Sequence, residues 1–250
     1  MVNEIKRDLN RAIYSLPFLW SSLAMVIAIA MGAGLKMLFP GEIGPGVVNG
    51  YHSQLILAGL SSKILLMVVP IICTLPYTGG FLDEYQSGFI KPYLIRCHKS
   101  GYIRGKVLGP GISGGLALSL GIFISYLLAS LIYKPLELAD PMALSSVHVV
   151  VSKMLVFFFC GCLWASVGSL LANITLSKYM AYGAPFVIYY VLIILSDRYF
   201  PSLYVLNPEE WLTPENPWVG GDWGIMLLIV LFTVIIMMIN DLVIERRIGD

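Results

Sequence analysis

The chain has 250 residues, of which 58% are hydrophobic and only 12% are charged, and its mean hydropathy is +0.81. Soluble domains carry about 25% charged residues, so this composition excludes a soluble globular protein and predicts an all-α, polytopic membrane protein. The formal net charge is +1, which excludes a general electrostatic attraction to nucleic acid.

The amino-terminal residues 3–16 are predicted to form an amphipathic helix in the membrane interface. Apolar residues recur at helical spacing, and Leu9 and Ile13 are expected to anchor the helix. The charged residues are assigned to the opposite face: Glu4, Lys6, Arg7, Asp8 and Arg11. The alternative for this segment is a polar tail without stable structure.

Six apolar segments predict six membrane spans within one transmembrane domain. They cover residues 17–39, 63–82, 107–133, 149–172, 182–197 and 224–244. Pro70 and Pro76 predict a kink in the second span, because each proline leaves a carbonyl without its helical donor. Residues 53–62 are apolar but short, and the sequence leaves open whether they extend the second span or form a separate interfacial helix.

Residues 198–223 are predicted to form a long extracellular segment that caps the spans. The segment contains four prolines, which forbid a long helix. It also contains Trp211, Trp218 and Trp223, and tryptophan is enriched at membrane interfaces. We expect Trp211 and Trp218 to serve the outer end of the protein.

The loop at residues 83–106 is the longest basic interruption between two apolar segments. Lys and Arg near span ends resist translocation, so we expect this loop and both termini to face the cytoplasm. Eleven basic residues are then cytoplasmic: Lys6, Arg7, Arg11, Lys91, Arg96, Lys99, Arg104, Lys106, Lys178, Arg246 and Arg247. The other five lie near outer span ends: Lys36, Lys63, Lys134, Lys153 and Arg198.

No catalytic or metal site is predicted. Residues 111–114 match the GxSG pattern of intramembrane serine proteases, but no histidine is placed where it could activate Ser113. Residues 101–106 depart from the phosphate-binding loop in spacing and lack the Ser or Thr that should follow the lysine. The four cysteines are expected to be free thiols, without a disulfide framework. We therefore expect a protein that is not an enzyme and has no nucleotide site of its own.

Ionisable residues are almost absent from the middle of the predicted spans. Lys63 and Lys153 fall near outer ends, and Asp241 falls near an inner end. Carriers that use protons or sodium usually place a carboxylate or histidine near the midplane. This absence makes an ion-coupled carrier a poor candidate.

The loop and its flanks resemble a known family. Gly79-Gly80-Phe81-Leu82 ends an apolar segment and is followed by DEYQSG at residues 83–88, then by Arg96, Ser100-Gly101-Tyr102 and RGKVLG at residues 104–109. This arrangement is similar to the motif of bacterial ABC exporter permeases of the second export class, also called type V exporters. The predicted layout resembles theirs over the whole chain, although Lys99-Ser100-Gly101 stands where the family often has Pro-x-Ser-Arg.

The resemblance implies the transmembrane subunit of an ATP-driven exporter in the bacterial cell membrane. Its substrate would be apolar or amphipathic, such as a peptide, a drug or a lipid. A separate ATPase subunit would bind ATP and Mg²⁺, so no cofactor is expected in this chain, and two permease chains, identical or different, would pair. The segment at residues 198–223 would form short re-entrant helices.

The resemblance also implies that residues 83–100 form a coupling helix on which the ATPase docks. The candidate docking residues are Glu84, Tyr85, Gly88, Phe89, Tyr93 and Arg96. Glu84 is expected to meet a group of the ATPase or to cap the start of the helix, and Gly88 to lie where the partner approaches closely. Two alternatives remain: a loop that faces lipid headgroups, and a non-transporting membrane protein such as a sensor or an assembly factor.

Overall fold

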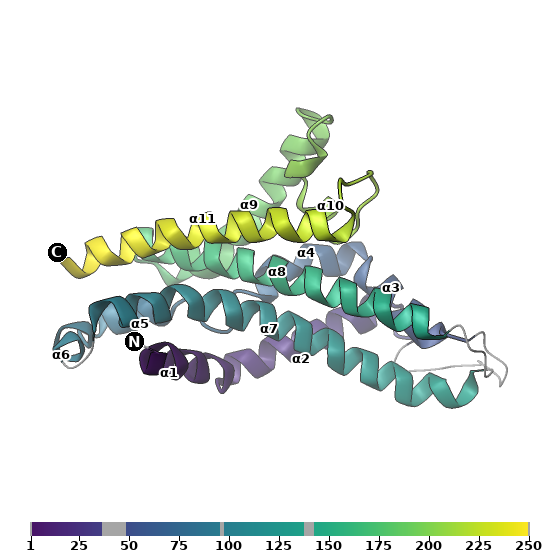
Figure 1. Cartoon of the computed structure of the whole chain (residues 1–250), viewed down its shortest axis with the longest axis horizontal. Coiled ribbons are helices and arrows are strands. Elements are labelled where there is room, and N and C mark those ends of the chain that lie inside the picture. The colour runs from purple at the N-terminus through teal and green to yellow at the C-terminus, as the bar shows by residue number, and fades with distance from the viewer. Residues whose placement is uncertain (1, 37–48, 96–97, 138–142, 250) are drawn as a thin grey trace.

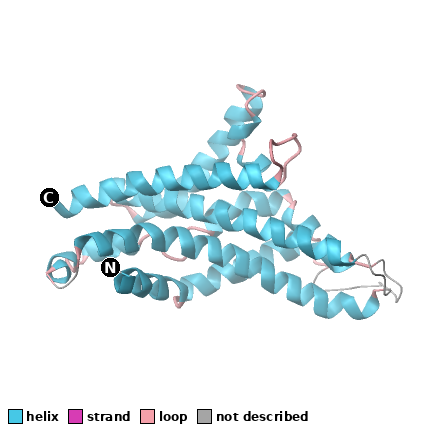
Figure 2. Ribbon diagram, viewed as in Figure 1, coloured by secondary structure: helices cyan, strands magenta, loops and turns pink. Residues whose placement is uncertain are grey.

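The computed structural model describes residues 2–36, 49–95, 98–137 and 143–249, and within them every regular element is helical (Figure 1, Figure 2). The helices are α1 (Val2–Ile13), α2 (Leu16–Gly32), α3 (Tyr51–Leu60), α4 (Lys63–Ile72), α5 (Gly80–Gln86), α6 (Ile90–Leu94), α7 (Lys99–Tyr133), η1 (Lys134–Leu136), α8 (Ala143–Thr175), α9 (Lys178–Arg198), η2 (Tyr204–Leu206), α10 (Pro208–Leu212) and α11 (Asp222–Gly249).

Four helices are long and apolar enough to cross a membrane: α7, α8, α9 and α11. The third to sixth predicted spans fall inside them. Two bent helix pairs also pass the test when each pair is counted once: α1 with α2, bent by 51°, and α3 with α4, bent by 68°. Over the residues that the structure describes, the protein is therefore all-helical, with four to six candidate membrane spans.

The second predicted span, residues 63–82, is not one continuous helix. The helix α4 ends at Ile72, residues 73–79 form turns, and α5 begins at Gly80. This interruption falls where the prolines predicted one, because α4 ends two residues after Pro70 and Pro76 lies in the turns. Residues 51–60 form the helix α3, which is bent by 68° from α4 and passes the span test only together with it. A separate break comes between α3 and α4, where the Ser62 hydroxyl accepts a hydrogen bond from the Leu65 N–H and caps α4.

The centre of the bundle is the pair α7 and α8, which lie side by side (Figure 1). Their contact uses the glycines that the sequence concentrates in residues 109–115. A Cβ atom at Gly114 would lie 2.6 Å from Ala165 Cβ, and one at Gly115 would lie 2.5 Å from the Phe158 carbonyl oxygen. The GxSG pattern is thus a helix-packing surface, and the Ser113 hydroxyl donates to the Pro110 carbonyl of its own helix.

Both termini lie at one end of the bundle, together with α5 and α6, and we call this the terminal end (Figure 1). The other end, where α7 finishes and α3 begins, is the far end. The helix α7 has 35 residues, so it is about 52 Å long and exceeds the hydrocarbon layer of about 30 Å.

Candidate functional site at the terminal end

A buried ion-pair cluster joins four segments at the terminal end. At its centre, Lys106 of α7 is 1% exposed. Its Nζ lies 2.8 Å from Glu84 Oε1 on α5 and 3.4 Å from Asp8 Oδ1 on α1, and it donates to the Tyr77 hydroxyl at 2.8 Å. One lysine thus ties α1, the turn at residues 73–79, α5 and α7 together.

Two further residues complete the cluster around Glu84, which is 7% exposed. The Arg11 guanidinium donates to Glu84 Oε1 at 2.7 Å, and the Tyr102 hydroxyl donates to Glu84 Oε2 at 2.9 Å. Two carboxylates thereby face two cations, so the charges of the cluster balance, although the Arg11 side chain is 64% exposed. Balance matters because removing one partner from a buried ion pair leaves an unpaired charge, which typically costs 3–5 kcal/mol.

Close packing of α1 and of Tyr77 against α7 makes the cluster possible. A Cβ atom at Gly105 would lie 2.6 Å from Asp8 Oδ2, and one at Gly109 would lie 3.1 Å from the Tyr77 ring. The two glycines are four residues apart, so they open one face of α7 on either side of Lys106. The RGKVLG sequence is therefore a helix surface with two notches for neighbouring segments.

This arrangement corrects two sequence predictions. Residues 83–106 were expected to be a loop, but α7 begins at Lys99, which places Lys106 about two helical turns inside a helix. Asp8 was assigned to the charged face of the amino-terminal helix, but it is 4% exposed and faces α7. The residue spacing already indicated that Asp8 faces inward, because Ile5, Asp8 and Ala12 are three and four residues apart and lie on one face of the helix.

The amino-terminal helix itself is confirmed, as α1. It ends at Ile13, where Ser15 caps the following helix through the Phe18 N–H. Leu9 and Ile13 are half-buried, while Ala12 is fully buried. The helix packs against α7, so its inward face is covered by protein.

The predicted coupling helix is two short helices rather than one. The helices α5 and α6 are joined by a turn in which Gly88 has φ +71°, a conformation that side-chain-bearing residues rarely adopt. A Cβ atom at Gly88 would meet nothing within 4 Å in the described residues, so backbone geometry already requires a glycine. The start of α5 is Gly80, so Glu84 lies in the body of the helix and does not cap it.

The candidate docking residues occupy two sides of this α5–α6 element. Glu84 points inward to the cluster, Tyr85 and Tyr93 are half-buried, and Phe89 is 50% exposed. Phe89 stacks on Tyr93 with 5.5 Å between ring centroids, and the Arg7 guanidinium lies 4.7 Å from the Tyr93 ring centroid. A cavity of about 180 Å³ separates α1 from α5–α6, lined by Arg7, Asp8, Arg11, Glu84, Phe89 and Tyr93. Arg96 lies outside the described residues.

The segment after α9 folds back onto the bundle at residues 204–212. Trp211 is 3% exposed, donates from Nε1 to the Val205 carbonyl at 2.8 Å, and stacks with Trp164 of α8. Trp218 is half-buried and contacts the Tyr204 ring edge-on. The Lys153 ammonium donates to the Leu212 carbonyl at 2.9 Å, which ties the short helix α10 to α8.

A second buried ion pair, at the far end, was not predicted from the sequence. His52 Nδ1 lies 2.7 Å from Glu137 Oε1, and the same carboxylate accepts hydrogen bonds from the backbone N–H groups of His52 and Gly50. Burial alone would raise the pKa of Glu137, but these hydrogen bonds and the His52 ring hold the pKa below its usual value. This pair fixes the start of α3 to the end of α7.

Comparison with protein-family models gives no match for this chain, and comparison with curated proteins gives no similar sequence. The residues of the site therefore have to support any functional assignment on their own.

Proposed function

We propose that the chain is the transmembrane subunit of an ATP-driven exporter, and that a separate ATPase docks on α5–α6. The observation that carries the proposal is the two-sided construction of this element. Glu84 holds the element to α1 and α7, while Phe89 and Ile95 remain 50% and 87% exposed. An exposed apolar tip on a fixed base suits a protein partner better than it suits water.

The cluster also supplies a route by which force on α5–α6 could reach the spans. A push on α5 acts on Lys106 through Glu84, and Lys106 belongs to the same continuous helix as the central part of the bundle. Tyr77 connects the cluster to the turn that follows α4. A packed polar network of this kind can couple two distant sites when the network has two arrangements and each site shifts the balance between them.

The remaining parts of the proposal follow from charge and composition. The terminal end would be cytoplasmic, because most of the lysines and arginines lie there. The membrane would be the bacterial cell membrane, a second permease chain would complete the transporter, and the substrate would be apolar or amphipathic. A chain without a phosphate-binding loop needs energy from another subunit, which would carry the ATP and Mg²⁺.

The test is co-purification from native membranes, followed by vanadate-sensitive ATP hydrolysis by the captured complex. Phe89→Asp should reduce ATPase capture about tenfold, because it places a charge in an apolar contact. The matched control is Phe200→Asp, which changes a phenylalanine of similar exposure (49%). Phe200 comes after the last residue of α9, Arg198, whereas α9 starts near α5 at Lys178. Equal capture by both variants, or no ATPase in the wild-type complex, would favour a non-transporting membrane protein.

A further inference from the structure

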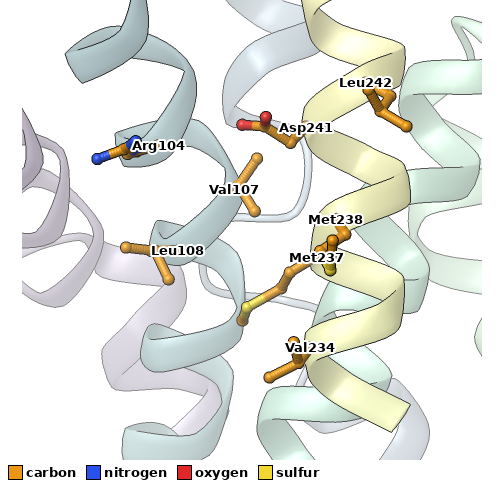
Figure 3. A pocket seen from close by; sticks show the side chains of 8 residues that line it. All are labelled: Arg104, Val107, Leu108, Val234, Met237, Met238, Asp241 and Leu242. Carbon is orange, nitrogen blue, oxygen red and sulfur yellow. The ribbon is translucent and has the colours of Figure 1, made fainter. Parts of the chain in front are cut away.

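A groove between α7 and α11 opens at the terminal end, away from the ion-pair cluster. It encloses about 400 Å³. Val107 and Leu108 line it on α7, and Val234, Met237 and Met238 line it on α11 (Figure 3). Met237 reaches across to Gly111 of α7, where a Cβ atom would lie 2.7 Å from Met237 Cε. The groove is thus long, apolar and bordered by flexible side chains.

The groove continues into a polar basin nearer the start of α7. The basin encloses about 380 Å³ and shares Arg104 and Asp241 with the groove. His98 and Lys99 line it from α7, and Glu245 lines it from α11. Polar groups therefore lie near the helix ends, and apolar groups lie deeper along the same path. A membrane lipid has the same order of headgroup and acyl chain.

The charges in the basin are balanced and accessible. Lys99 and Arg104 supply two cations, and Asp241 and Glu245 supply two carboxylates. The Lys99 ammonium and the Glu245 carboxylate are 3.8 Å apart, with side chains 47% and 57% exposed. An exposed ion pair at that distance contributes little to the stability of the folded state. Either side chain can therefore turn to a ligand with little loss of stability.

We propose that the groove and the basin bind a phospholipid whose zwitterionic headgroup carries a primary ammonium, as in phosphatidylethanolamine. One acyl chain lies in the groove, and the phosphate meets Lys99 and Arg104. The ammonium donates hydrogen bonds to Asp241 and Glu245. The site is separate from the α5–α6 element, so the proposal does not depend on an ATPase partner.

Two features select this headgroup over the common alternatives. An anionic lipid would match the two cations but would place no positive charge beside the two carboxylates. A choline headgroup has no N–H to donate, and proteins usually hold it in a cage of aromatic rings. No Phe, Tyr or Trp is among the described residues that line the basin.

Native mass spectrometry of the detergent-purified chain, titrated with lipids of matched acyl chains, tests the headgroup assignment. Phosphatidylethanolamine should bind about tenfold more tightly than phosphatidylcholine or phosphatidylglycerol. A tenfold difference in Kd is about what one charge-assisted hydrogen bond contributes to binding. The double variant Asp241→Asn with Glu245→Gln should lose this preference. The control Asp83→Asn, which removes a carboxylate elsewhere at the terminal end, should keep it. Equal binding of the three lipids, or a preference that survives the double variant, would overturn the proposal.

A photoreactive acyl chain tests the position of the lipid. Cross-links from phosphatidylethanolamine should map to α7 and α11 around Leu108 and Met238. Met238→Trp should fill the groove and remove them, while Leu227→Trp, at a position of similar exposure on the same helix (70% against 65%), should leave them in place. Cross-links spread evenly over the bundle, or unchanged by Met238→Trp, would show that the groove is not the site.

Discussion

The two ends of the bundle both bury charged groups, but they do so in different ways. At the terminal end, Lys106 lies between two carboxylates, and its contacts join four segments. At the far end, Glu137 meets one histidine and two backbone N–H groups, and the contacts join two segments. The terminal cluster has two carboxylates and two cations from three helices, whereas the far-end carboxylate has a single histidine as its side-chain partner. We therefore expect the terminal end to be the more strongly fixed of the two.

The largest expected effect comes from removing the central cation. Lys106→Met leaves Asp8 and Glu84 without their shared partner, and breaking a buried ion pair costs about 3–5 kcal/mol. The unfolding midpoint of the purified protein should fall accordingly, and α1 should exchange its amide hydrogens faster. The control is Lys99→Met, which changes an exposed lysine and should shift stability by less than about 1 kcal/mol. Similar shifts for the two variants would show that the cluster does not hold the terminal end.

The sequence predicted the helices that apolar runs define, and it failed where distant segments meet. The spans at α7, α8, α9 and α11 follow from hydropathy alone, and α1 follows from its periodic pattern. The pairing of Asp8 with Lys106 joins residues 98 positions apart, and no local period encodes such a contact. The position of Lys106 was also missed, because basic residues suggested a loop where a long helix begins.

The inward direction of Glu84 has the same origin. Charge and motif indicated a residue available to a partner, but the cations that pair with it come from α1 and α7. The exposed side of the same element, at Phe89, was among the predicted docking residues. Sequence reasoning thus grouped these residues in one segment and could not tell which of them the rest of the chain would bury.

A smaller effect is expected from filling one of the notches in α7. Gly105→Ala places a methyl group 2.6 Å from Asp8 Oδ2, so the carboxylate that contacts Lys106 has to shift. Overpacking of this kind costs about 1–3 kcal/mol. Hydrogen exchange should show faster opening of α1, with the far end unchanged. At Gly183, where a Cβ atom meets nothing within 4 Å, the same substitution should be neutral or slightly stabilising. Equal effects at the two glycines would contradict close packing of α1 on α7.

Acid should loosen the far end through Glu137. The folded state lowers the pKa of this carboxyl, so its stabilising contribution is complete above the ordinary carboxyl pKa and is lost as the pH falls through the lowered value. Hydrogen exchange at the start of α3 should therefore accelerate only below about pH 4. Glu137→Gln should speed this exchange at neutral pH and flatten its acid dependence. An acid response that is unchanged in the Gln variant would assign it to other groups.

The smallest expected effect belongs to an exposed ion pair at the terminal end that lies outside the cluster. Asp83 of α5 pairs with Lys178 at the start of α9, and both side chains are more than half exposed. Solvent screens such a pair, so a double-mutant cycle with Asp83→Asn and Lys178→Met should give a coupling energy close to the limit of measurement. Glu84 is the next residue on the same helix. A double-mutant cycle with Glu84→Gln and Lys106→Met should give a clearly larger coupling energy, because Glu84 and Lys106 are both buried. The two carboxylates share one short helix and each faces a lysine, so the comparison sets a buried ion pair against an exposed one on the same element. If the two coupling energies are equal, burial does not distinguish the cluster from an ordinary surface ion pair, and the greater rigidity expected of the terminal end loses its physical basis.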